Sequence, residues 1–152
     1  MSQQMADPFV WDNKEYVFIG ADDVYTLFDT STFGLKPTAP HTACWKGFVI
    51  HFLLKNNQLY ISKLEVYCED NNYPSINNID AYKEENESFY MYDSLNLPLT
   101  YTGNIVIGTK LLDRYVGRAF TGAHSYENTY DLHFVDGILE SYLDSTGKYS
   151  GF

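Results

Sequence analysis

The stretch from Trp45 to Cys68, WKGFVIHFLLKNNQLYISKLEVYC, decides the fold of this chain. Its first part, as far as Leu54, is an apolar run of β-prone residues. The short polar segment Lys55-Asn56-Asn57-Gln58 follows and favours a turn, because asparagine tolerates a positive φ. The second part alternates with imperfect phase near Ser62: one face receives Leu59, Ile61 and Lys63, and the other receives Tyr60, Leu64, Val66 and Cys68. Two runs of this kind around a short turn predict a β-hairpin.

A second hairpin is expected near the C-terminus of the sequence. The runs 130–135 and 138–143 are β-prone, and Asp136-Gly137 separates them. This dipeptide favours a type I′ turn, whose twist matches the flanking strands.

Shorter signals predict the remaining elements. A turn at 11–14 leads to a strand at 15–19 that Gly20 ends, and further strands are expected at 88–92 and 104–112. Asp22 or Asp23 can cap a short helix over 24–28.

The fold class follows from these elements together with the length. A chain of 152 residues has the size of one domain. We expect a single domain over 1–152, with 1–8 and 144–152 flexible. The domain is expected to be mainly β, an antiparallel sheet forming a sandwich or a partly closed barrel with one or two short helices. An α+β arrangement is the alternative.

The net charge of −10 limits the classes of partner that this chain is expected to bind. Nucleic acid phosphates and anionic membranes repel an acidic chain, so we expect neither as a partner. The longest apolar stretch, 48–54, is far too short to span a bilayer, and residues 1–11 do not have the pattern of a secretion signal. A cytoplasmic location, with Cys44 and Cys68 reduced, is therefore expected.

Catalytic and cofactor motifs are not visible. His41, His51, His124 and His133 form no metal-binding spacing, and the sequence contains no nucleophile elbow or phosphate-binding glycine loop. Cys44 lies near His41 but precedes an apolar run, where a free cysteine is usually a small buried hydrophobe. We expect no cofactor and no metal, and the sequence favours a non-catalytic role. An enzyme with a dispersed site, using His41, His124 and a carboxylate, is an alternative.

The segment from Glu69 to Asp93 is the candidate binding region. It contains seven acidic residues and one lysine, which gives −6 of the net −10. Ile76, Ile79 and Tyr82 have helical spacing, so a short surface helix is expected here, or else a long ordered loop. The predicted binding residues are Asp80, Tyr82, Glu84, Glu85, Glu87, Tyr90 and Tyr92.

This segment suggests binding to a basic protein, since charges steer association and aromatic side chains supply contact energy. An immunity-type antagonist of a basic toxin or enzyme is the leading interpretation. A solvated loop that only confers solubility, and a ligand-binding β-barrel lined by the abundant aromatic residues, are the alternatives. Lys110, Arg114 and Arg118 would form a positive stripe on a helix and could contact the acidic segment.

The segment Thr42-Ala43-Cys44-Trp45-Lys46-Gly47-Phe48, with Leu59-Tyr60-Ile61 after the turn, carries a resemblance. It resembles a family of small uncharacterised bacterial proteins with a Trp-Arg/Lys-Gly-aromatic segment followed by a β-hairpin. Tyr101-Thr102-Gly103 before a strand is similar as well. The family has no established function, so the resemblance implies an architecture and no catalytic residues.

Overall fold

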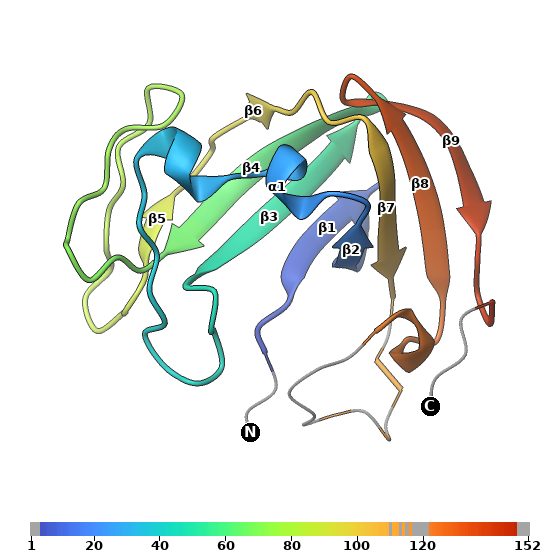
Figure 1. Cartoon of the computed structure of the whole chain (residues 1–152), viewed down its shortest axis with the longest axis horizontal. Helices are drawn as coiled ribbons and strands as arrows, with labels where there is room; N and C mark the ends of the chain where they lie inside the picture. Colours follow the sequence, from blue (N-terminus) through green and yellow to red (C-terminus); the bar gives the residue numbers. More distant parts are fainter. Residues whose placement is uncertain (1–3, 110, 113, 115, 117–121, 149–152) are drawn as a thin grey trace.

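Seven strands of the chain close into a β-barrel in the computed structural model, which describes residues 4–109, 111, 112, 114, 116 and 122–148 (Figure 1). Their order around the barrel is β3-β1-β2-β7-β8-β9-β4, and pairing between β3 and β4 closes it. The bounds are β1 Asp7–Trp11, β2 Lys14–Ala21, β3 Phe48–Lys55, β4 Gln58–Val66, β7 Gly103–Gly108, β8 Thr129–Val135 and β9 Ile138–Asp144. The expectation of a mainly β fold with a barrel is confirmed.

Small elements complete the fold. The short strands β5, Tyr90–Tyr92, and β6, Leu97–Pro98, both pair with β4. The helix α1 spans Val24–Leu27, and 3-10 turns occur at Thr30–Phe33 (η1) and Ala123–Ser125 (η3). Asp23 caps α1, since its carboxylate accepts the N–H of Tyr25 at 3.0 Å. This confirms the predicted helix with the second of its two candidate caps.

Three strand pairs are joined by two-residue turns in which both central residues have positive φ. Their φ values are 53° and 60° at Asp12-Asn13, 51° and 64° at Asn56-Asn57, and 50° and 81° at Asp136-Gly137. Such values define type I′ turns, which match the twist of antiparallel strands. Both predicted hairpins are confirmed, and the turn at 11–14 joins a third pair.

The imperfect phase near Ser62 is a β-bulge. His51 pairs with Lys63 and Phe52 pairs with Ile61, so Ser62 is the extra residue, and its hydroxyl donates to the His51 carbonyl at 3.1 Å. An extra residue reverses the alternation of faces along a strand. The predicted division of faces is therefore wrong: the buried residues on both sides of the bulge are Leu59, Ile61, Leu64 and Val66.

The expectation of a flexible segment over 1–8 is wrong at its end. Asp7 and Pro8 belong to β1, which pairs antiparallel with β2 and parallel with β3. Asp7 is buried because one carboxylate oxygen accepts the Ile50 N–H at 2.8 Å and the other forms an ion pair with Lys46. At the other end, Asp144 belongs to β9 and Ser145 is buried.

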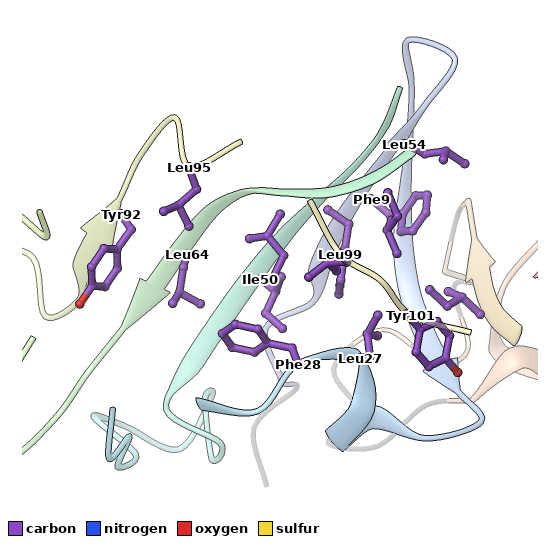
Figure 2. Close-up of a cluster of buried hydrophobic side chains, with 14 of the residues drawn as sticks. Phe9, Leu27, Phe28, Ile50, Leu54, Leu64, Tyr92, Leu95, Leu99 and Tyr101 are labelled. Carbon is purple, nitrogen blue, oxygen red and sulfur yellow. The ribbon is translucent and has the colours of Figure 1, made fainter. Parts of the chain in front are cut away.

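The hydrophobic core contains side chains from the barrel strands and from the helix and loop segments that pack against them. Figure 2 shows Leu27 and Phe28 from the α1 region among the same buried cluster as Phe9, Ile50 and Tyr101. Four residues are too few for a helix to be stable alone, so this packing stabilises α1.

Candidate functional site

The acidic segment, defined here as residues 69–93, is a long loop that ends in β5 (Figure 1, left). The predicted surface helix is wrong, and the alternative of an ordered loop is correct. Ile76 pairs with Ile79, and Tyr82 pairs with Met91, each as an isolated antiparallel bridge. The many asparagines have a backbone role, because four of them occupy left-handed positions: Asn71, Asn77, Asn78 and Asn86.

Tyrosines hold this loop in place. Tyr92 is fully buried, and its hydroxyl donates to the Pro74 carbonyl at 2.6 Å. Burial raises the pKa of Tyr92 to about 12. Tyr73 stacks on Tyr90 with 3.9 Å between ring centroids, and its hydroxyl accepts the Cys68 N–H at 2.8 Å. Burial also raises the pKa of Tyr73.

The predicted binding residues therefore divide into two groups. Tyr92 was expected on the binding surface, and this is wrong because its side chain lies in the core. Tyr90 is partly buried and stacked on Tyr73. The exposed members are Asp80, Tyr82, Glu84, Glu85 and Glu87. Tyr82 is 41% exposed and is the accessible aromatic side chain of this group.

The carboxylates of the segment have no cationic partner among the described residues. All seven acidic residues of 69–93 are exposed. Their side-chain contacts are local hydrogen bonds, such as Asp70 accepting the Asn72 N–H at 3.1 Å and Asp80 accepting from the Ser75 hydroxyl. Lys83, the lysine of the segment, donates to the Glu87 carbonyl at 3.2 Å. The negative charge is therefore presented to solvent.

The histidines do not assemble a site in the described part of the chain. His51 and His133 lie in strands, as expected, and bond to Glu65 at 2.8 Å and Asn104 at 2.9 Å. The hydrogen bond from His51 lowers the pKa of Glu65. The loop before β3, which carries His41, and η3, which carries His124, lie apart in Figure 1. Over the described ranges, no group of three His, Cys, Asp or Glu side chains could hold a metal ion.

Both cysteines are buried and unpaired. Cys44 packs with Val49 and Phe89 in a small second cluster outside the barrel wall. Burial raises the pKa of both thiols, which disfavours the thiolate. The interpretation of Cys44 as a small hydrophobe is thus supported by its surroundings.

An apolar pocket of about 320 Å³ lies between α1 and strands β1, β2 and β3. Phe18 and Phe52 line it as a stacked pair with 5.3 Å between centroids, and Lys46 and Asp7 line it as an ion pair. Sequence reasoning missed this pocket because its walls come from separate elements. The one signal available in the sequence was the spacing of Phe48 and Phe52 along one predicted strand, since both residues line the pocket.

Lys110 and Arg118 of the predicted basic stripe lie outside the described residues, so its contact with the acidic segment stays a prediction. Within the ranges that are described, none of the helices is long and apolar enough to cross a membrane. No protein-family model, curated protein or solved structure matches this chain.

Proposed function

We propose that this protein is a non-catalytic binding protein, of the kind that antagonises a basic toxin or enzyme, and that its acidic segment is the docking surface. The observation that carries the proposal is the set of seven exposed carboxylates with no ion pair to a described residue. A field of this kind attracts a positively charged surface and speeds encounter with it. The proposal includes a cytoplasmic location, where the two free thiols stay reduced.

The shape of the segment supports the same role. The Tyr82–Met91 bridge and the buried Tyr92 hydroxyl fix the loop before any partner arrives. A preordered loop loses less conformational entropy on binding than a disordered one. Tyr82 supplies an exposed aromatic contact next to the charges of Glu84 and Glu85, which is the combination that binding surfaces favour.

The test is capture and titration of the partner with a triple variant, Glu84→Gln, Glu85→Gln and Glu87→Gln. The native protein should recover a basic protein from lysate of the source cell at low salt and lose it at high salt. The variant should bind the purified partner about tenfold more weakly, because three exposed ion pairs contribute about 0.5 kcal/mol each.

A matched control separates local charge from net charge. Glu15→Gln, Glu127→Gln and Asp136→Asn change the net charge by the same amount at exposed positions outside the segment. This control should retain the native affinity. Equal affinity of both triple variants, or binding that is insensitive to salt, would contradict the proposal.

The pocket under α1 favours a second candidate function, binding of a small apolar molecule. Its volume of about 320 Å³ and its phenylalanine lining fit such a ligand. The native protein should enhance the fluorescence of N-phenyl-1-naphthylamine, and Ile50→Phe, which fills the pocket, should abolish the enhancement. Ile50→Leu conserves volume and should retain it. Equal fluorescence with both variants would exclude this pocket.

A further inference from the structure

We infer that the free edge of β9 binds an extended, positively charged segment of a partner protein by strand addition. This inference does not depend on the proposed function, because β9 and the acidic segment lie on opposite sides of the molecule (Figure 1). It concerns a second surface and a different mode of recognition.

The edge is open because β9 runs past the end of its neighbour. β9 pairs with β8 from Ile138 to Asp144. Its pairing with β4 is limited to Ile138 opposite Gln58. Two hydrogen bonds flank this pair: the Leu59 N–H donates to the Gly137 carbonyl at 2.9 Å and the Leu139 N–H donates to the Asn57 carbonyl at 2.8 Å. In the part of the chain that the structure describes, no strand pairs with residues 140–144 on that side.

The hydrogen-bonding groups at this edge can be assigned from the ladder. Leu139 directs its N–H away from β8, whereas the Ser145 N–H donates to Thr129 on the β8 side at 3.0 Å. Leu139 and Ser145 are six residues apart and would direct their N–H groups to the same side of a regular strand. The extra residue at the bulge, Glu140, explains why these two N–H groups point to opposite sides. Backbone groups alternate sides along a strand, so Tyr142 and Asp144 present their N–H and C=O groups to the open edge.

The hairpin of β8 and β9 also exposes apolar side chains. Four large hydrophobic residues are more than a third exposed there: Val135 at 36%, Ile138 at 41%, Tyr142 at 61% and Leu143 at 55%. Tyr142 meets Trp11 edge to face with 4.9 Å between centroids. Both line a groove of about 700 Å³ whose other walls include Leu53, Leu139 and the polar turns at 12–13 and 55–57. Exposed apolar side chains beside an open edge suit the addition of a strand whose alternate side chains contact Tyr142 and the groove.

Charge decides between a second copy of this chain and a different partner. An antiparallel β9–β9 pair that overlaps residues 140–144 would be centred on Tyr142. Each copy would bring two carboxylates, Glu140 and Asp144, and no lysine or arginine into this short ladder, and the repulsion between four negative charges destabilises such a pair. A partner segment that carries lysine or arginine near Glu140 and Asp144 would instead be attracted to these carboxylates. The same carboxylates therefore disfavour self-pairing and favour a basic strand.

The experiment uses synthetic peptides and the amide resonances of the native protein. The probe is a capped peptide with the length of β9, seven residues, that alternates lysine and valine. It should shift the amide resonances of Tyr142 and Asp144. The same peptide N-methylated along its pairing edge should not, because strand addition depends on main-chain hydrogen bonds. A peptide with glutamate in place of lysine should have an affinity at least about tenfold lower than that of the lysine peptide.

Variants make the assignment specific. Glu140→Lys with Asp144→Lys should reverse the preference between the two peptides, whereas Glu15→Lys with Glu127→Lys, a matched charge change elsewhere, should leave the preference unchanged. The triple variant at Glu84, Glu85 and Glu87 should bind the lysine peptide at β9 as the native protein does, so failure here is distinguishable from failure of the acidic segment.

Four results would overturn the inference. They are unshifted amides at Tyr142 and Asp144, equal shifts with the N-methylated peptide, and sedimentation of the native protein as a dimer with these amides protected. The fourth is binding of the lysine peptide only by a variant truncated after Lys148, since the chain's own last residues would then be the occupant of the edge.

Discussion

Replacing Gly137 by alanine should destabilise the protein by about 3 kcal/mol. Gly137 has a φ of 81°, and an L-residue in the left-handed region costs about 1–2 kcal/mol. The added β-carbon would also lie 1.8 Å from the Leu99 carbonyl oxygen, so the two chain segments must separate. That movement stretches two hydrogen bonds, from the Gly137 N–H to the Tyr101 carbonyl at 2.8 Å and from Gln58 Nε2 to the Leu99 carbonyl at 3.0 Å. Each contributes about 0.5–1.5 kcal/mol.

Urea denaturation followed by circular dichroism measures this loss as a difference in the free energy of unfolding. Gly147→Ala is the control, because Gly147 has a similar φ of 76° but no atom within 4 Å of an added β-carbon. It should cost about 1 kcal/mol, from the backbone alone. Equal losses for the two variants would refute the claim that the close approach of the Leu99 carbonyl adds to the cost of Gly137→Ala.

Three further predictions concern side chains. Tyr92→Phe should cost about 1 kcal/mol in urea denaturation, and ultraviolet titration should leave Tyr92 protonated until about pH 12; ionisation near pH 10 would contradict its burial. The hydrogen bond from His51 lowers the pKa of Glu65 below its usual 4.5, so its stabilising effect is present above pH 4.5 and is lost as the pH falls through the lowered value. Glu65→Gln should flatten the acid side of the stability curve, and an unchanged curve would refute this contribution. Because burial raises the pKa of both thiols, Cys44 and Cys68 should react with a thiol reagent at least about tenfold more slowly in native than in urea-denatured protein, and fast native labelling of Cys44 would count against its burial.

Local turn chemistry made the hairpins predictable. Asn56-Asn57 and Asp136-Gly137 are residue pairs that accept positive φ, and both positions adopt it. The irregular phase near Ser62 was visible in the sequence, but its meaning required the partner strand. A bulge is defined by two residues facing one, and one strand alone does not show which residue is extra.

Contacts between distant residues explain what sequence reasoning missed. Asp7 and Pro8 have low strand preference, and β1 forms there because the Asp7 carboxylate bonds to Ile50 and Lys46 some forty residues away. The spacing of Ile76 and Ile79 fits one helical turn or one tight bridge equally well, and the asparagines nearby favour the bridge. The exposed carboxylates were predictable from composition, whereas the burial of Tyr92 and the open edge of β9 depend on topology.

The most direct test of the acidic segment as a docking surface is photo-crosslinking in the source cell. A photoreactive residue would replace either Tyr82, which is 41% exposed within the segment, or Glu15, which is exposed on β2. We expect a covalent adduct with a basic protein from position 82, weakened by the Gln substitutions at Glu84, Glu85 and Glu87, and no such adduct from position 15. No adduct at position 82, or the same adduct from both positions, would contradict this expectation.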